Sequence, residues 1–282
     1  MVELRNIQFG YAKGRKLFDG VSLTLTPGHV YGLLGKNGAG KTTLLKIMSG
    51  LRFASDGDAL ILGHRAEARD AEIYENCYFL QEEMYVPHLK IKEFVKAYAP
   101  YYPNFDQEQF DHFMTEFELT EERGYIDRLS HGQKKKVLIS FALATNTQIL
   151  LMDEPTNGLD IPSKSVFRRV VASTANENRI IVISTHQVRD LHSLIDTVTI
   201  LDNGKIMLNA TSEEITNNLV FDFVAPGEHT PADSEILYSE DTPRGIFVVR
   251  ENTENTDSKL DIEMLFNAVI AKPEKIQKIF GL

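Results

Sequence analysis

A glycine-rich loop near the N-terminus carries residue types that bind phosphate. The segment Gly35-Lys-Asn-Gly-Ala-Gly-Lys-Thr-Thr43 fits the pattern G-x-x-x-x-G-K-[ST]. In such a loop, backbone N–H groups cradle phosphates, the lysine reaches the β and γ oxygens, and the hydroxyl residue serves Mg²⁺. We therefore expect a nucleotide site that contains Gly35, Asn37, Gly38, Ala39, Gly40, Lys41, Thr42 and Thr43.

Two adjacent acids follow an apolar segment farther along the chain. Asp153 and Glu154 come directly after Ile149-Leu-Leu-Met152, which is typical of a buried strand. Such a pair suits a division of labour, in which one carboxylate holds Mg²⁺ through water and the next polarises an attacking water. Together with the glycine loop, the pair predicts hydrolysis of a bound nucleotide.

Polar residues also follow two other apolar segments. Gln81 comes after Cys77-Tyr-Phe-Leu80, and His186 comes shortly after the segment from Arg179 to Ser184. Open α/β sheets hold ligands at the carboxyl ends of their strands, so both residues are candidates for the same site. Taken alone, each is also explained as an ordinary surface residue.

The elements around the glycine loop place its phosphate at the start of a helix. Gly28 to Leu34 is typical of a turn and a buried strand, and Thr42 to Ser49 is typical of a helix that Gly50 ends. The free amides and the dipole of a helix N-terminus favour anions. This context supports a phosphate site over a simple glycine turn.

A second helix start contains a serine and a short basic run. Leu129-Ser-His-Gly-Gln133 precedes an amphipathic helix that we expect from Lys134 to Ala144. Ser130 and the amides after it suit either a second anion site or a simple N-cap. A solvated helix face explains the basic run Lys134-Lys-Lys136 as well as a bound ligand does.

Two flanking regions complete the main part of the chain. Val2 to Phe9 and Val21 to Thr26 alternate with period two and predict an antiparallel hairpin. Tyr11 lies in the turn between these two strands, and its ring either stacks on a nucleotide base or covers the core. Helical periodicity broken by prolines predicts an inserted helical subdomain at about residues 87–146. Within it, Tyr98-Ala-Pro-Tyr-Tyr102 is either a partner-docking surface or aromatic core.

The last part of the chain predicts a separate small unit. Strands from Thr197 to Leu201 and from Lys205 to Leu208 close the main domain, which we place at residues 1–218. Residues 219–282 predict a small α+β domain with short strands and an apolar helix from Ile262 to Ile270. This unit has no catalytic constellation.

Composition narrows the class of protein. The chain has 282 residues and a formal net charge of -10, which argues against a general nucleic-acid binder. Its one cysteine, Cys77, excludes an internal disulfide and a cysteine-based metal cluster, and we expect it to be inert. The longest apolar runs are strand-sized and the N-terminus lacks a secretory signal, so we expect a soluble, intracellular protein.

With these pieces in order, residues 1–218 resemble the nucleotide-binding subunits of ATP-binding cassette (ABC) transporters. Six motifs occur in the family's order, namely the aromatic Tyr11, the Walker A loop Gly35–Thr43, the Q-loop Gln81, the signature Leu129-Ser-His-Gly-Gln133, the Walker B acids Asp153 and Glu154, and the switch His186. Asp160 matches the family's D-loop. The resemblance implies an α/β fold of the P-loop NTPase class and ABC type, with an N-terminal antiparallel β subdomain and an inserted helical subdomain.

The resemblance also implies a role for each motif residue in binding ATP and Mg²⁺. Tyr11 would stack on adenine, and Lys41 with the loop amides would hold the β and γ phosphates. Metal ligands, direct or through water, would be Thr42, Gln81 and Asp153. Glu154 would be the general base, and His186 would contact the γ-phosphate and the attacking water.

Other motif residues would act on a second subunit. Ser130, Gly132 and Gln133 would close on ATP bound to an opposing cassette, so the resemblance implies a homodimer or heterodimer. His131 departs from the family pattern, which usually has Gly there, and its side chain could crowd the facing phosphate. We expect activity to survive this departure, although a regulatory or slow site is an alternative.

Overall resemblance favours a bacterial exporter-type cassette, with import as the alternative direction. The Tyr98 to Phe105 tract contributes to this interpretation. The permease would consist of separate integral membrane subunits, and the cassette would lie in the cytoplasm on the inner face of the membrane. One alternative is a soluble ABC ATPase that acts on ribosomes or DNA, and another is a module that binds ATP without hydrolysing it. The acidic charge opposes the first alternative, and intact Glu154 and His186 oppose the second.

Overall fold

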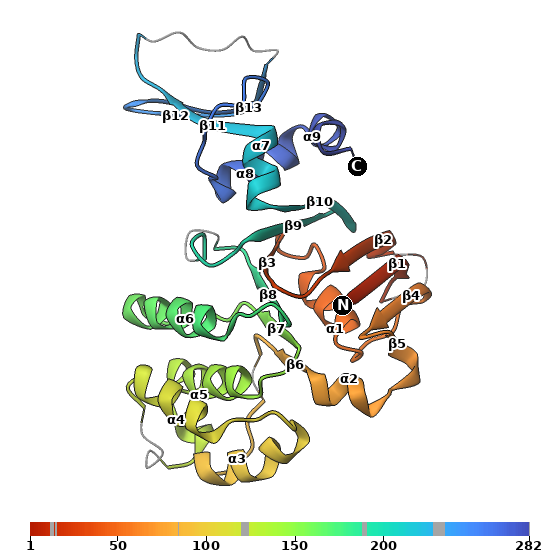
Figure 1. Cartoon of the computed structure of the whole chain (residues 1–282), viewed down its shortest axis with the longest axis vertical. Coiled ribbons are helices and arrows are strands. Elements are labelled where there is room, and N and C mark those ends of the chain that lie inside the picture. The colour runs from red at the N-terminus through yellow and green to blue at the C-terminus, as the bar shows by residue number, and fades with distance from the viewer. Residues whose placement is uncertain are drawn as a thin grey trace.

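A computed structural model describes residues 1–11, 14, 16–83, 85–119, 124–187, 191–227 and 235–281. Within these ranges, the strands form three sheets, and helices cover them (Figure 1). The central sheet has the order β10-β9-β3-β8-β7-β6 and is parallel except for β10. Its strands are β3 (His29–Leu34), β6 (Cys77–Leu80), β7 (Ile149–Asp153), β8 (Ile180–Thr185), β9 (Thr197–Asp202) and β10 (Lys205–Thr211).

The central strands are apolar because both faces of this sheet are buried. In β7, Ile149 and Leu151 join one hydrophobic cluster, whereas Leu150 and Met152 join the other. Successive residues of a strand point to opposite faces, so one short segment contributes to both layers. The predicted strand is confirmed and extends to Asp153.

The N-terminal hairpin is confirmed and belongs to a second, antiparallel sheet with the order β2-β1-β4-β5. Its strands are β1 (Val2–Phe9), β2 (Phe18–Leu25), β4 (Asp56–Ile61) and β5 (His64–Arg65). Helix α1 (Lys41–Met48) lies between this sheet and the central sheet (Figure 1). The short helices η1 (Ala66–Ala68) and α2 (Ala71–Asn76) then lead into β6.

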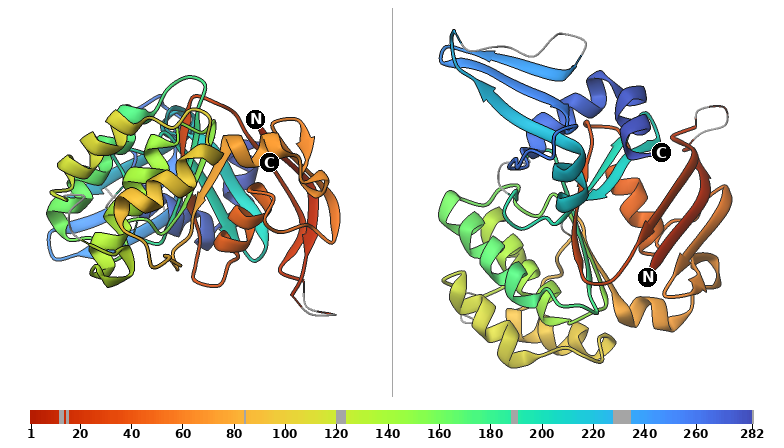
Figure 2. Two further views of the ribbon diagram at one scale, coloured as in Figure 1. Left: turned by 90° about the horizontal axis from the view of Figure 1, so that it is seen from below. Right: turned by 45° about the horizontal axis from the view of Figure 1, so that its top comes forward.

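The opposite face of the central sheet is covered by α5 (His131–Ala144) and α6 (Ile161–Thr174) (Figure 2). The described residues between β6 and α5 include α3 (Ile91–Tyr98), η2 (Ala99–Tyr101) and α4 (Gln107–Glu116), and η4 (Ile126–Arg128) leads into α5. The ring of Phe141 on α5 lies 5.0 Å from that of Phe94 and 5.2 Å from that of Phe105, measured between centroids. Aromatic packing thus holds the helical region on α5.

Two expectations about α5 need correction. The helix begins at His131 rather than Lys134, because Ser130 Oγ caps it and Gln133 Oε1 accepts a hydrogen bond from the Ser130 backbone N–H. The basic run is not a solvated face throughout, since Lys135 is fully buried. Packing of α5 against the turn after β7 decides this burial.

The C-terminal residues form an antiparallel sheet with the order β11-β13-β12, as expected for an α+β unit. Its elements are α7 (Ser212–Asn218), β11 (Leu219–Val224), β12 (Ile236–Thr242), β13 (Gly245–Glu251), α8 (Ile262–Ala271) and α9 (Pro273–Phe280). Leu265 of α8 and Val249 of β13 join the same hydrophobic cluster as Val198 of the central sheet. This unit therefore packs continuously onto the main body.

No helix within the described ranges is long and apolar enough to cross a membrane.

Candidate functional site: a nucleotide cavity at the glycine loop

The glycine loop lies between β3 and α1, and its close contacts require glycine. Gly40 precedes α1 with φ +107°, and a Cβ there would lie 2.7 Å from the Phe18 ring. A Cβ on Gly35 would lie 2.5 Å from the carbonyl oxygen of Leu201. Both positions exclude larger side chains, so the loop can bring its amides to the start of α1, where anions are favoured.

Lys41 places its ammonium group inside this loop. The residue is 7% exposed, and its Nζ donates a hydrogen bond to the carbonyl oxygen of Gly35 at 2.8 Å. Burial lowers the pKa of Lys41, and the charges of Glu154 and Asp153 oppose that effect. The Lys41 ammonium also lies 3.9 Å from a carboxylate oxygen of Glu154. The lysine cation and the candidate catalytic base therefore lie side by side.

Asp153 receives hydroxyl donors on both of its oxygens. Thr42 donates to Oδ2 at 2.6 Å, and Ser184, on the neighbouring strand β8, donates to Oδ1. Asp153 is 1% exposed, so these bonds offset the cost of burying its charge. A hydroxyl beside a carboxylate is an oxygen donor set that suits Mg²⁺.

Glu154 combines a strained backbone with an unpaired oxygen. Its φ of +45° is in the left-handed region, which a non-glycine residue adopts at a cost. Its Oε1 lies 2.8 Å from Nδ1 of His186, whereas its Oε2 is buried and has no hydrogen-bond partner within the described structure. A buried carboxylate oxygen without a donor is unfavourable, so it is suited to receive a hydrogen bond from a bound water.

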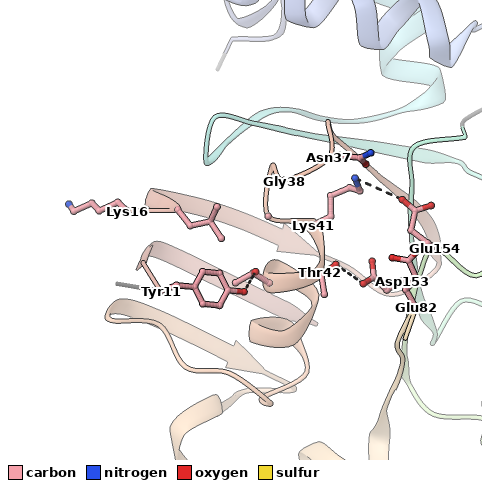
Figure 3. A pocket seen from close by; sticks show the side chains of 12 residues that line it. Tyr11, Lys16, Asn37, Gly38, Lys41, Thr42, Glu82, Asp153 and Glu154 are labelled. Carbon is pink, nitrogen blue, oxygen red and sulfur yellow. Dashed lines mark hydrogen bonds and ion pairs between the residues drawn. The ribbon is translucent and has the colours of Figure 1, made fainter. Parts of the chain in front are cut away.

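These groups line a cavity of about 600 Å³ (Figure 3). Tyr11 and Glu154 lie at opposite ends of it, with Lys41 and Thr42 between them. Its lining residues are Tyr11, Lys16, Leu17, Asn37, Gly38, Gly40, Lys41, Thr42, Thr43, Glu82, Asp153 and Glu154. Gly35 and Ala39 belong to the loop but are not in the lining. His186 is also outside the lining, and it contacts the site through its hydrogen bond with Glu154.

Tyr11 contributes an exposed ring to the lining of the cavity. It is 65% exposed, and its hydroxyl is 2.6 Å from the Thr43 hydroxyl. The Arg52 guanidinium lies over the ring, 5.0 Å from its centroid. The hydrogen bond and the cation therefore orient an exposed aromatic ring, as stacking on a base requires.

The residue after β6 that lines the cavity is Glu82, not Gln81. Glu82 accepts a hydrogen bond from the side-chain amide of Asn157 at 2.9 Å. Gln81 is the residue that the sequence singled out after this strand, and Glu82 was not among its candidates. The run Gln81-Glu-Glu83 offers three polar candidates after one strand, and the exit path of the chain from β6 selects among them.

The signature and D-loop residues lie outside this cavity. Ser130 is exposed and caps α5, with Ser130 Oγ accepting from the backbone N–H of Gln133 at 3.3 Å. Asp160 caps α6, and hydrogen bonds from Ser163 lower the pKa of Asp160. Gly132 lies close to the turn that precedes Asp160, because a Cβ on Gly132 would come 3.1 Å from the carbonyl oxygen of Gly158. One chain therefore does not bring these residues to its own cavity.

The His131 side chain packs against Gly158, which lies two residues before the D-loop residue Asp160. A Cβ on Gly158 would lie 2.7 Å from Cδ2 of His131 and 3.2 Å from its Nε2. The ring thus occupies space beside a glycine with φ +80°. This contact was not apparent from the sequence.

Comparison with known proteins identifies the family of this chain. The family described as ABC transporter matches residues 18–157. The chain is 30% identical to the ABC transporter ATP-binding protein NatA of Bacillus subtilis strain 168 over 69% of this chain and 82% of that protein. It is 28% identical to the ABC transporter ATP-binding protein YtrB of the same organism, over 73% of this chain and 70% of that protein.

A solved ATP-binding subunit of an ABC transporter has the same fold. The TM-score is 0.69 at 24% identity, over 76% of this chain and 91% of that one. The predicted fold class is confirmed. The glycine loop, the paired acids and these relatives lead to one conclusion: the chain belongs to the ATP-binding subunits of ABC transporters and is an ATPase.

Proposed function

We propose that this chain hydrolyses ATP in a dimer of cassettes and drives separate membrane subunits, in the direction of export. The observation that carries the proposal is Glu154, whose buried Oε2 has no partner within the described structure and whose Oε1 faces His186. Glu154 takes the proton of the attacking water, and His186 holds the carboxylate in place. Lys41 faces the developing phosphate charge from the loop side.

We propose Mg²⁺ as the metal that accompanies ATP. Thr42 and Asp153 would hold it, because their hydroxyl and carboxylate already lie 2.6 Å apart at the cavity wall. When bound, the ion neutralises charge on the phosphates. The resemblance gives Gln81 a share in this role, and Glu82, which lines the cavity, is a further carboxylate that we propose for it.

The dimer is supported by the position of the signature. Ser130 is exposed at the start of α5, and Ser130, Gly132 and Gln133 are not in the lining of their own cavity. Free amides and a hydroxyl at a helix start bind anions well. In the proposed dimer they close on the γ-phosphate held by the partner subunit, and Asp160 lies at the same interface.

A groove on the helical subdomain is the proposed docking surface for a membrane subunit. It has a volume of about 830 Å³ and is lined by Lys92, Val95, Lys96, Ala99, Pro100, Tyr102, Pro103, Phe105, Gln107 and Asp111. Tyr102 packs against Tyr78 of β6, with ring centroids 5.4 Å apart, and β6 leads directly to Glu82. A partner in this groove would therefore act on the strand that ends at the cavity. In this arrangement, the cassette lies on the inner face of the membrane.

We further propose that residues 1–218 form the ATP-binding domain, with the helical subdomain at about 87–146, and that residues 219–282 form an accessory domain. Support comes from the separate sheet β11-β13-β12. The shared hydrophobic cluster makes the two parts pack as one body.

The central test is phosphate release by Glu154→Gln. This variant keeps the shape of the side chain but removes its basicity, so we expect hydrolysis to fall by about 10²–10⁴-fold. ATP binding should persist, and ATP should now trap the dimer in size-exclusion chromatography. Hydrolysis at the wild-type rate by Glu154→Gln would refute the assigned role of Glu154.

Partners are tested separately by recovering the protein from membranes. Bound integral membrane subunits and an ATPase rate that responds to them would support the transport role. Tyr102→Ala should reduce this recovery without reducing ATP binding, because Tyr102 lines the groove and not the cavity. Recovery only with ribosomes or DNA would instead favour the soluble alternative.

A further inference from the structure

A buried lysine lies directly beneath the catalytic turn. Lys135, in the second turn of α5, is 0% exposed. Its Nζ donates hydrogen bonds to the carbonyl oxygens of Glu154 at 2.8 Å and of Asn157 at 3.1 Å. These bonds join the helix that begins after Ser130 to the turn that carries the proposed base.

The peptide groups around Glu154 are fixed from several sides. The Glu154 N–H donates to Ser184, with its Oγ at 3.1 Å and its carbonyl oxygen at 3.2 Å. The Glu154 carbonyl oxygen accepts from the Asn157 N–H at 3.2 Å as well as from Lys135. A strained φ persists only when its surroundings hold it, so these bonds maintain the backbone that aims the Glu154 carboxylate.

The charge of Lys135 also interacts with the acidic residues of the site. Burial lowers the pKa of Lys135, whereas the charges of Glu82, Glu154 and Asp153 raise it. Glu82 contacts the same turn from the cavity side, through the Asn157 amide. The Lys135 ammonium therefore holds the carbonyl oxygen of Asn157, and the Glu82 carboxylate holds its side-chain amide.

We propose that Lys135 is a positioning residue for the catalytic base: it holds the Glu154–Asn157 turn in its strained form and ties that turn to the signature helix. The inference rests on the proposed function, because it assigns Lys135 an action through Glu154. A displacement of α5 at Ser130 would be transmitted to the Glu154 peptide by the Lys135 ammonium. Docking of the signature on the partner's nucleotide would thus act on the base within the same chain.

The test compares Lys135→Met and Lys135→Arg with Lys134→Met. Met keeps the apolar stem but removes the positive charge and every hydrogen-bond donor. Arg keeps the positive charge and has hydrogen-bond donors. Lys134→Met removes the same charge from the neighbouring, partly exposed position. Single-turnover hydrolysis, binding of a fluorescent ATP analogue and the melting temperature are measured for each variant.

We expect Lys135→Met to slow hydrolysis by about 10²-fold, the size of effect that a small misplacement of a catalytic group produces. Nucleotide affinity should be unchanged because Lys41 and the glycine loop are not altered. Lys135→Arg should recover part of the rate, and Lys134→Met should match wild type. If Lys135 only stabilised the fold, its substitution would lower the melting temperature but would not slow hydrolysis while leaving nucleotide affinity unchanged.

A double variant shows whether Lys135 acts through Glu154. In the Glu154→Gln background, Lys135→Met should cause no further slowing, because a positioning residue has nothing left to position. Hydrolysis by Lys135→Met at the rate of Lys134→Met, or additive slowing in the double variant, would overturn the inference. If Lys135→Met does not fold, Lys135→Gln, which keeps a neutral donor, is judged by the same criteria.

The two proposals fail in different ways. An active Glu154→Gln variant contradicts the proposed function. An inactive Glu154→Gln variant beside a fully active Lys135→Met variant contradicts only the role of Lys135.

Discussion

The contact between His131 and Gly158 yields a quantitative prediction. Gly158 has φ +80°, and a Cβ there would lie 2.7 Å from Cδ2 of His131. Gly158→Ala therefore carries two costs. The left-handed backbone costs an alanine about 1–2 kcal/mol, and turning the His131 ring out of its rotamer costs about 0.5–1.5 kcal/mol.

A matched glycine separates the two costs. Gly63 has φ +85°, and a Cβ there would meet nothing within 4 Å. Gly63→Ala should thus lower the free energy of unfolding by only about 1–2 kcal/mol. Gly158→Ala should lower it by about 1.5–3.5 kcal/mol in total. Equilibrium urea unfolding, followed by circular dichroism, measures each value.

The His131→Gly background completes the cycle. Without the ring, Gly158→Ala should lose its excess over Gly63→Ala, a coupling of about 0.5–1.5 kcal/mol. If the effects of His131→Gly and Gly158→Ala simply add, the ring does not pack against Gly158 and the reasoning is wrong. ATPase rates of the same variants show whether His131 also tunes the site, and an unchanged rate for His131→Gly would make it a spacer.

Three further predictions concern separate parts of the chain. Tyr11→Ala should weaken ATP binding by about 1–3 kcal/mol in calorimetry, whereas Tyr11→Phe should retain most of the affinity because it loses only the hydroxyl contact with Thr43. Burial raises the pKa of Cys77 to about 12, so iodoacetamide should label it only when the protein is unfolded, and labelling of the folded protein would contradict its burial. A hydrogen bond from His88 holds the pKa of Asp127 below its ordinary value of 3.8, so its stabilisation is present above that value and is lost as the pH falls through the lower, folded-state pKa. Asp127→Asn should therefore lower the melting temperature at neutral pH and converge with wild type in acid, and a constant difference across that range would exclude this linkage.

Local patterns were sufficient for much of the fold and for the centre of the site. The glycine loop, the strand before Asp153 and the capped start at Ser130 each follow from a few neighbouring residues, because backbone angles, caps and burial on both faces leave a strong local signature. The resemblance then ordered these pieces into one fold class. The boundaries shifted by a few residues, as with α5, because capping bonds extend a helix beyond its apolar periodicity.

Tertiary structure alone decided which side chains meet. After β6, the path of the chain brings Glu82 rather than Gln81 to the cavity. In α5, packing against the turn at Glu154 buries Lys135, although its sequence neighbours suggested a solvated basic face. A residue type and its spacing define what chemistry is available, but the neighbours that come from distant segments define the direction and burial of each side chain. For that reason the sequence by itself determined a phosphate loop with a pair of acids, and only the folded chain showed the lysine that holds one of those acids in place.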